Sequence, residues 1–255
     1  MRILFLGDIV GSCGRDAVRR TVPQLRRELA LDYVVVNGEN IAGGRGIMPQ
    51  HADELFSCGV DIVSGGNHTF QHREVYDYLD ATPAILRPLN YPPGAPGHGV
   101  ATVGDLTVIN VLGRTFMGLD SDDPFRAVDA ALKDVPPEQF VLVDLHAEAT
   151  SEKQAMGWYL DGRVTAVVGT HTHVPTADHR LLPRGTAFCS DAGMCGARDS
   201  IIGDDVEAVL RRFLTQMPTR LPAAKGTAVI NGLLIEADPA TRLARSIERC
   251  DMVVE

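Results

Sequence analysis

Short apolar runs rich in β-branched residues alternate with amphipathic segments along this chain, and this alternation constrains the fold most strongly. The runs at residues 2–6 ("RILFL") and 33–37 ("YVVVN") are typical of strands buried on both faces. Between them, Val18, Val22 and Leu25 share one face of a predicted helix. Strands that alternate with helices early in the chain and form hairpins later predict an α/β fold with mixed sheets.

The helical segments carry their own start and stop signals. A short helix is predicted to begin at Pro49 and to end at Gly59. We expect Pro23 to divide the first helical segment into two helices, because proline fits best in a first helical turn. Ser151 and Gln154 occupy the positions of a capping box at the start of a later helix.

Composition argues against several classes of protein. The net charge of −9 argues against a long nucleic-acid footprint, which depends on clustered lysine and arginine. The longest apolar runs are far shorter than the roughly 20 residues that cross a bilayer, and the N-terminus lacks the apolar core of a signal peptide. The five cysteines are scattered without C-x-x-C spacing. We therefore expect a cytoplasmic protein that forms one domain over residues 1–255 and binds no membrane.

Polar side chains stand at the ends of the predicted strands. His171 and His173 follow the run "VTAVVG", and residues two apart in a strand face the same side. Neutral imidazole is the commonest metal ligand in proteins. The carboxyl ends of strands in an α/β sheet are where ligands bind, so we expect such side chains to gather there and hold a pair of metal ions. The candidates are Asp8, Glu39, Asn40, Asn67, His68, His146, His171 and His173.

Other interpretations of single residues stay open at this point. Asp8 alone could cap the following helix, and Asn67 alone could be a turn residue. A dinucleotide-binding protein is a second alternative, in which Glu39 would accept a ribose hydroxyl. However, "GDIVGSCGR" lacks the G-x-G-x-x-G spacing, and Glu39 follows it by about 30 positions rather than about 20. A non-catalytic regulator that binds metal or nucleotide is a third.

Six motifs, in this order, resemble those of a known family: "GDIVG", "NGEN", "GGNHT", "DLHAEATSEK", "GTHTHVPTAD" and "DAGMCG". The chain resembles the calcineurin-like metallophosphoesterases, and most closely their YmdB-like branch. The resemblance covers essentially the whole chain. It implies a four-layer α/β/β/α sandwich with two mixed sheets between helices. It also implies a phosphodiesterase that acts on 2′,3′- or 3′,5′-cyclic nucleotides or on related small phosphodiesters.

The resemblance also assigns roles in a first metal site. Asp8 would bind the first metal ion together with Asn40 and His173, and Glu39 would bridge both ions. Most members of the broad family carry a histidine two residues after the aspartate, whereas this chain has Val10 there. Asn40 is the adjacent candidate for the missing ligand, and the YmdB-like branch shows the same replacement.

The second site and the reaction follow from the same resemblance. Asn67, His146 and His171 would complete the second site, and His68 would protonate the leaving oxygen without binding metal. Two metal ions can hold one phosphate and generate hydroxide at neutral pH, and histidine is a common proton donor. The resemblance implies iron or manganese in the site, with iron expected first, a small nucleotide as substrate, and a homotetramer as an assembly that family members often form. The mixed oxygen and imidazole donors also suit zinc.

Two further residues have roles that the sequence leaves open. Asp144, two residues before His146, could orient a histidine ring from outside the metal ligands or could be a buried structural aspartate. Arg45, in the glycine-rich stretch "AGGRGIM" at residues 42–48, could contact phosphate or could be solvated.

Overall fold

The first apolar run of the chain lies at the centre of a five-stranded sheet in the computed structural model, which describes residues 1–255. The strands, in spatial order, are β14 (Ala244–Arg249), β13 (Gly232–Ala237), β1 (Arg2–Leu6), β3 (Tyr33–Asn37) and β4 (Ile62–Ser64). Strand β1 pairs parallel with β3 and antiparallel with β13, so this sheet is mixed.

A six-stranded sheet is built from the middle of the chain. Its strands, in spatial order, are β5 (Val100–Val103), β6 (Leu106–Leu112), β7 (Phe140–His146), β8 (Ala166–Thr170), β10 (Ala187–Cys189) and β9 (Arg180–Leu181). Strands β6, β7 and β8 run parallel, whereas β5 and β9 at the two edges pair antiparallel with their neighbours. The expected α/β class with mixed sheets is confirmed.

A third sheet departs from the expectation of two. Its strands, in spatial order, are β15 (Met252–Val254), β12 (Ala228–Ile230), β11 (Met194–Ala197) and β2 (Asp8–Ile9). It continues the five-stranded sheet, because only Gly7 separates β1 from β2 and only Asn231 separates β12 from β13. The N–H of Gly7 donates to the carbonyl of Asn231 over 3.1 Å at this break. A Cβ on Gly7 would lie 1.9 Å from the carbonyl oxygen of Gly193, so only glycine fits there.

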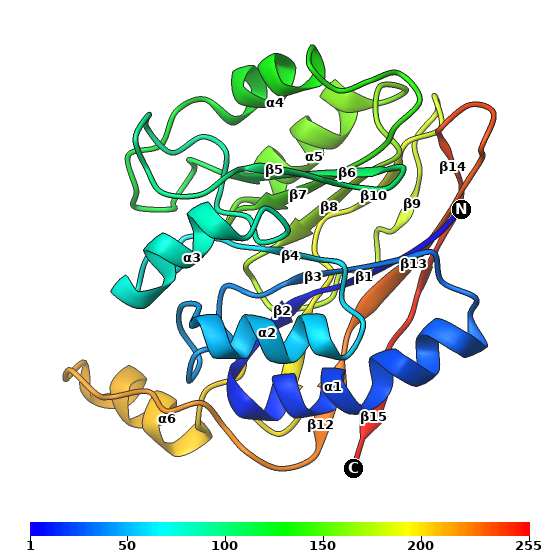
Figure 1. The fold of residues 1–255 in the computed structure, drawn as a ribbon. Coiled ribbons are helices and arrows are strands. Elements are labelled where there is room, and N and C mark those ends of the chain that lie inside the picture. Colours follow the sequence, from blue (N-terminus) through cyan, green and yellow to red (C-terminus); the bar gives the residue numbers. More distant parts are fainter.

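Helices cover the outer faces of the two larger sheets (Figure 1). Their bounds are α1 (Gly11–Glu28), α2 (Pro49–Ser57), the 3₁₀ turn η1 (Arg73–Val75), α3 (Tyr76–Ala81), α4 (Pro124–Leu132), α5 (Thr150–Leu160) and α6 (Val206–Thr215). Helices α1 and α2 lie against the five-stranded sheet, and α4 and α5 lie beyond the six-stranded sheet. Helix α2 begins at Pro49, as the sequence predicts.

Alternate side chains of β1 pack into two different cores. Ile3 and Phe5 belong to a core that also contains Leu106 and Val108 of β6, so this core fills the space between the two larger sheets. Leu4, one residue along the strand, packs instead into the core beneath α1 and α2. A strand with apolar residues on both faces therefore joins the two layers, as the unbroken apolar run predicts.

Helix α1 continues through Pro23, so the expected division into two helices is wrong. Val18, Val22 and Leu25, on both sides of the proline, are buried in one core. A proline inside a helix costs about 3 kcal/mol, whereas burying one such side chain contributes about 1.5–3 kcal/mol. The continuous apolar face therefore outweighs the proline.

The expected capping box of Ser151 and Gln154 does not form. Helix α5 begins one residue before Ser151, which therefore lies inside the helix, and no side chain caps the first turn. The nearby carboxylate of Glu152 instead accepts hydrogen bonds from the backbone N–H groups of Arg114 and Thr115. This end of α5 is therefore fixed by a loop from elsewhere in the chain.

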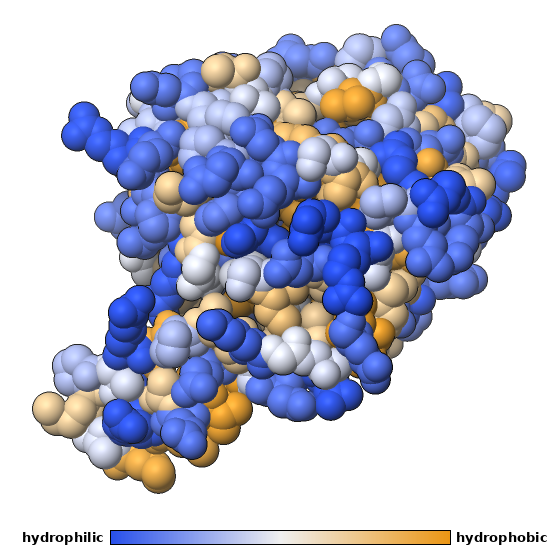
Figure 2. All heavy atoms as spheres, turned by 60° about the horizontal axis from the view of Figure 1, so that its bottom comes forward, coloured by the Kyte–Doolittle hydropathy of each residue, from blue (hydrophilic) through white to orange (hydrophobic).

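Helix α6 projects away from the sheets at the lower left of Figure 1. Figure 2 shows hydrophobic side chains on this lobe, and the side chains of Phe213 and Leu214 are among the exposed large apolar groups. Asp205 caps the helix by accepting the N–H of Ala208 over 2.9 Å. None of the helices combines the length and apolar character that crossing a membrane requires.

Candidate metal centre

All of the predicted site residues lie at one edge of the two larger sheets, where strands end. Asp8 belongs to β2, directly after β1, and His146 is the last residue of β7. The others lie in the turns that follow β3, β4 and β8. The strands therefore deliver polar side chains from both sheets to one place. These side chains are Asp8, Glu39, Asn40, Asn67, His68, His146, His171 and His173.

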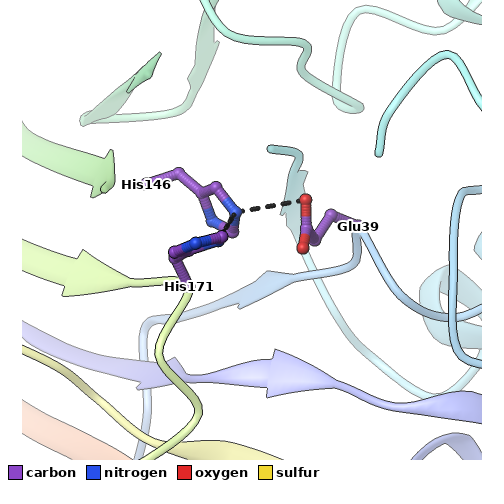
Figure 3. A group of neighbouring side chains, drawn as sticks. All are labelled: Glu39, His146 and His171. Carbon is purple, nitrogen blue, oxygen red and sulfur yellow. Dashed lines mark hydrogen bonds and ion pairs between the residues drawn. The ribbon is translucent and has the colours of Figure 1, made fainter. Parts of the chain in front are cut away.

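Three donor atoms converge on the Nε2 atom of His146. Asn67 Oδ1 lies 2.9 Å from it, Glu39 Oε2 lies 3.1 Å from it, and His171 Nδ1 also lies 3.1 Å from it. Figure 3 shows Glu39 and His171 pointing toward the His146 ring from separate segments. His146 and Glu39 are buried, and the His171 side chain is 21% exposed. We call Glu39, Asn67, His146 and His171 the deep group.

A second set of donors lies beside the first and shares Glu39 with it. His173 Nε2 lies 3.8 Å from Asp8 Oδ1 and 3.2 Å from Asn40 Nδ2, which in turn lies 2.8 Å from Glu39 Oε1. We call Asp8, Asn40 and His173 the rim group. One oxygen of Glu39 thus faces the deep group and the other faces the rim group.

The carboxylate of Asp8 has one oxygen without a hydrogen-bond partner. Asp8 Oδ2 accepts the backbone N–H of His171 over 3.0 Å, but the buried Oδ1 accepts no hydrogen bond. Leaving a buried polar atom unpaired costs about 1–3 kcal/mol. Oδ1 lies between the His146 and His173 rings, 3.7 Å from His146 Nδ1 and 3.8 Å from His173 Nε2. A cation at this position would satisfy it.

Two local features bring Glu39 into the centre. The chain leaves strand geometry after Asn37, whose side-chain oxygen accepts the N–H of Glu39 over 3.1 Å. This turn allows the consecutive residues Glu39 and Asn40 to reach the same site. Gly66 leaves the space opposite, since a Cβ there would lie 2.3 Å from Glu39 Oε2 and 2.5 Å from His146 Nε2.

The prediction that His171 and His173 project from one face of a strand is wrong in its geometry. Strand β8 ends at Thr170, and the φ angles of His171 and His173 are 98° and 66°. Such left-handed backbone costs of order 1–3 kcal/mol per residue and requires support from its surroundings. The hydrogen bond from the His171 N–H to Asp8 supplies part of it. Both rings still face the centre, but a turn rather than a strand directs them.

A buried ion pair holds the residue between these two histidines. Lys153 Nζ lies 2.7 Å from Asp191 Oδ2, and both side chains are buried. The same oxygen accepts the backbone N–H of Thr172 over 3.1 Å and its hydroxyl over 2.7 Å. Removing one partner of a buried ion pair costs about 3–5 kcal/mol. Lys153 and Asp191 therefore position the turn that carries both histidines.

Outer hydrogen bonds set which nitrogen of the two turn histidines faces the centre. His173 Nδ1–H donates to the carbonyl of Ile202 over 2.7 Å, so its Nε2 presents a lone pair to Asp8. His171 Nε2 lies 3.1 Å from Glu148 Oε2. A proton on that nitrogen leaves Nδ1 as the lone-pair atom toward His146. Such outer partners commonly orient metal-binding histidines.

A longer chain of hydrogen bonds orients His146. Its Nδ1 lies 2.9 Å from the hydroxyl of Thr170, which donates to Asp144 Oδ1 over 2.7 Å. Because that hydroxyl gives its proton to Asp144, it accepts the N–H of His146, and Nε2 presents the lone pair. Asp144 therefore acts on the ring through Thr170. Asn37 donates to the other oxygen of Asp144 over 3.0 Å.

The pKa values of the deep group show that Glu39 and His146 stabilise each other's charged forms. Burial favours the neutral carboxyl, but the charge and hydrogen bond of His146, followed by those of His68, hold the pKa of Glu39 well below its ordinary value. Burial opposes the charged form of His146, but Glu39 and then Asp8 raise its pKa to about 9. Burial and the charge of His146 lower the pKa of His171 to about 3. The carboxylates thus demand a positive charge, which a metal cation supplies in place of a proton.

These observations fit a centre for two cations. The residues around Glu39 form two overlapping sets of possible metal ligands, one with His146 and His171 and one with Asp8 and His173. Lone pairs of the imidazole rings face the centre, and the unpaired Asp8 Oδ1 lies among them. Mixed imidazole and oxygen donors suit first-row transition metals.

His68 lies at the open side of this centre. Its Nδ1 is 3.1 Å from Asn40 Oδ1 and 3.3 Å from Glu39 Oε1, and its side chain is 31% exposed. Its backbone N–H donates to Glu39 Oε2 over 3.1 Å. Its Nε2 forms no hydrogen bond within the chain, and this atom is therefore available to a bound molecule.

Sequence reasoning missed the residues that support the donors. Lys153 and Asp191 stand in the motifs "DLHAEATSEK" and "DAGMCG", but opposite charges 38 positions apart carry no sign that they pair. Thr170 precedes His171 directly, but it is not among the predicted site residues. A hydroxyl at the end of a strand beside two histidines is the signal that would have marked it.

Comparisons with known proteins agree with the motif resemblance. The model of the YmdB-like protein family matches residues 4–250. A 2′,3′-cyclic-nucleotide 2′-phosphodiesterase of Bacillus subtilis is 45% identical over 254 residues, which cover 98% of this chain and 96% of that protein.

Two solved structures share the fold over all or nearly all of their length. A hypothetical protein from Thermus thermophilus superposes with a TM-score of 0.93 at 44% identity, with both chains covered completely. A novel phosphatase from Mycoplasma pneumoniae superposes with a TM-score of 0.92 at 32% identity, covering 99% of this chain and 93% of that one.

Proposed function

The chain belongs to the YmdB-like protein family, and from this membership we propose that it is a metal-dependent hydrolase of phosphodiesters. Its proposed substrates are cyclic nucleotides, 2′,3′-cyclic, 3′,5′-cyclic or both, or related small phosphodiesters. One observation carries the proposal: a relative that is 45% identical over 98% of this chain is a 2′,3′-cyclic-nucleotide 2′-phosphodiesterase. The two donor groups that share Glu39 support its dependence on metal.

The rim group and the deep group are proposed to hold one metal ion each. Glu39, whose two oxygens face the two groups, is the proposed bridging ligand. A pair of metal ions in such a site binds a phosphate and supplies a hydroxide nucleophile at neutral pH. Asn40 presents its Nδ2 to the rim group and its Oδ1 to His68. Half a turn of the amide exchanges these atoms and directs the metal-binding oxygen toward the rim group.

The identity of the metal is proposed from the donors and the family resemblance. Imidazole, carboxylate and amide oxygen donors suit iron, manganese and zinc. Iron is the proposed occupant, because the resemblance to the YmdB-like branch implies it first.

His68 is the proposed proton donor for the leaving oxygen. Asn40 and Glu39 hold its Nδ1, and its Nε2 is free on the open side of the centre. A proton on Nε2 can therefore pass to an alkoxide that leaves a phosphate bound beside Glu39. General acid catalysis of this kind contributes about 10²- to 10⁴-fold to a rate.

Two alternatives have less support. A dinucleotide-binding function does not explain why Asp8, Glu39 and His146 lie close together. A non-catalytic regulator would use the same donors, and only turnover separates it from an enzyme. A single domain over residues 1–255 is part of our proposal, since both larger sheets contribute ligands. The homotetramer stays a prediction.

Turnover by the purified protein tests the proposed function. Metal content should be measured by mass spectrometry on the same sample that is assayed with 2′,3′-cyclic and 3′,5′-cyclic nucleotides, a chromogenic phosphodiester and phosphomonoesters. We expect up to two transition-metal ions per chain and turnover of cyclic nucleotides. Chelation should abolish turnover and metal addition should restore it. Full activity of the metal-free protein, or a fully metal-loaded protein that cleaves no phosphodiester, would contradict the proposal.

A further inference from the structure

A cavity lined by three arginines is built in part from segments that also carry residues of the candidate metal centre. We propose that this arginine cavity binds a second phosphate of the substrate. Preferred substrates would then carry a cyclic phosphate for cleavage and a further phosphate on the 5′ side. The cavity has a volume of about 420 Å³ and is lined by Arg45, Arg212, Arg220, Gln71 and His72 among others. This inference rests on the proposed phosphodiesterase function.

Two walls of the cavity come directly from segments that carry site residues. The loop at residues 42–46 follows Asn40 after one residue, and Gln71 and His72 follow His68 within four residues. The N–H of Gln71 donates to the carbonyl of His68 over 3.0 Å, which ties this wall to the proposed proton donor. Segments that carry site residues therefore continue directly into two walls of the cavity.

The same walls are joined to each other and to Arg45. His72 Nε2–H donates to the carbonyl of Arg45 over 3.1 Å, so the glycine-rich loop is held at its middle residue. A Cβ on Gly44 would lie 3.3 Å from the Cβ of Ala223, so the loop packs against the segment that follows Arg220. Arg45, whose role the sequence leaves open, is thus placed at a cavity wall.

The third wall reaches the rim group through the segment around Ile202. Ile202 accepts the hydrogen bond from His173 Nδ1, and Asp204 pairs with Ala223 in an isolated bridge. Burial raises the pKa of Asp204, and the nearby charges of Arg45, His173 and then Arg212 oppose that rise. The charges of a proposed metal ligand and of two arginines of the cavity thus act on one carboxylate.

The three arginines are available to an anion. None of Arg45, Arg212 and Arg220 forms an ion pair, whereas nine other arginines of the chain do. Three unpaired guanidinium groups around one hollow give it a positive charge in a protein whose net charge is −9. Figure 2 shows strongly hydrophilic side chains where the α6 lobe meets the body.

Guanidinium groups and the size of the cavity favour phosphate as the ligand. Arginine binds phosphate through paired N–H donors, and such charge-assisted hydrogen bonds are stronger than neutral ones. The volume lies within the range of about 300–1,000 Å³ that is typical of small-molecule sites. The acidic remainder of the surface argues against binding of a long nucleic acid. The proposed ligand is therefore one additional phosphate close to the scissile one.

Three related substrates test the proposal on the metal-loaded enzyme. The first is 2′,3′-cyclic AMP, the second is its 5′-phosphorylated form, and the third is a dinucleotide that ends in a 2′,3′-cyclic phosphate. We expect kcat/KM to be about tenfold higher for at least one of the two substrates with a second phosphate, as one added charge-assisted contact predicts. The second and third substrates distinguish a terminal phosphate from an internucleotide phosphate. The preference should shrink as salt is raised from about 50 to 500 mM.

Variants that remove the positive charge of arginines test whether the arginine cavity causes the substrate preference. In Arg212→Gln/Arg220→Gln, the kcat/KM ratio of the preferred substrate to 2′,3′-cyclic AMP should fall about tenfold relative to the wild type. Arg211→Gln is the matched control, because Arg211 is exposed on α6 beside Arg212 but does not line the cavity. It should keep the wild-type ratio. Thermal melting confirms that these exposed substitutions leave the fold intact.

The outcomes separate the two proposals. Equal kcat/KM for all three substrates in the wild type would overturn the second-phosphate site and leave the phosphodiesterase function standing. An unchanged ratio in the double variant, or an equal fall for every substrate, would also overturn it. Cleavage of 3′,5′-cyclic nucleotides or the chromogenic phosphodiester but of none of the three would also overturn the second-phosphate site. Failure of the metal-loaded enzyme to cleave any phosphodiester would instead contradict the proposed function.

Discussion

The deep group and the rim group share Glu39 but differ in how His146 of the first and His173 of the second are held. His146 is the last residue of a central strand, is buried, and is oriented through Thr170 by the buried Asp144. His173 lies beyond the end of a strand, is about one-tenth exposed, and is oriented by the carbonyl of Ile202, an exposed residue. The deep group therefore has one histidine that is built into the core, whereas the only histidine of the rim group lies on a turn, which also carries His171 of the deep group.

This difference predicts unequal metal affinities. A ligand whose position is fixed by buried neighbours binds a metal ion without losing further conformational freedom. A ligand on a turn that is oriented by an exposed neighbour is held less firmly before the metal ion binds. We therefore expect the deep group to retain its metal ion more tightly than the rim group. The rim group, which adjoins His68, is the half that can adapt to substrate.

The largest expected effect comes from a residue that touches the rim group without belonging to it. His68→Ala should lower kcat by about 10²- to 10⁴-fold, because the leaving oxygen loses its proton donor. Metal content measured by mass spectrometry should stay at the wild-type value. The loss should shrink for a substrate with a nitrophenolate leaving group, which needs no proton. Loss of metal together with activity would place His68 among the ligands and would contradict our assignment.

A smaller effect is expected from a change at Thr170, which orients His146 of the deep group. Thr170→Val removes the hydroxyl that accepts the N–H of His146 and donates to Asp144. Changes to such outer partners typically weaken metal binding about 10- to 100-fold. The more tightly bound metal ion should therefore become easier to remove in a chelator titration. Thr170→Ser keeps the hydroxyl and serves as the control. Equal affinity in wild type and Thr170→Val would show that Asp144 is only structural.

The smallest effect is expected at the rim. Asn40→Ala should weaken one metal ion about tenfold and leave the other at its wild-type affinity, because water can replace a neutral amide ligand at a partly open site. Isothermal titration of the metal-free protein resolves the two affinities. A variant that binds both ions as the wild type does would remove Asn40 from the site. Equal weakening of both metal ions would contradict the predicted independence of the rim group and the deep group.

The surroundings of Val10 explain why this chain lacks the histidine that most members of the broad family carry at that position. Val10 is buried and packs closely against Gly203, where a Cβ would lie 2.7 Å from a Val10 methyl carbon. The larger imidazole of a histidine does not fit in this space. A Val10→His change is therefore not expected to rescue Asn40→Ala.

Much of the site can be predicted because its chemistry lies in short segments. Apolar runs predict buried strands, and a polar residue that ends such a run stands at the edge of a sheet where ligands bind. Asp8, Glu39, His146 and His171 are found in this way. The same local patterns do not predict the third sheet or strands β2, β9, β10 and β11, which have four residues or fewer. Segments so short do not show a clear periodicity.

The identity of the donors and the strand ends at which they stand follow from the sequence alone, because side-chain chemistry and periodicity are properties of neighbouring residues. The direction in which those donor side chains point depends on the tertiary structure. The left-handed turn at His171, the Lys153–Asp191 ion pair and the arginine cavity join segments that are distant along the chain. The sequence does not show which partner a charged or hydrogen-bonding group will contact. Their pairing follows from the packing of the sheets and helices that bring them together.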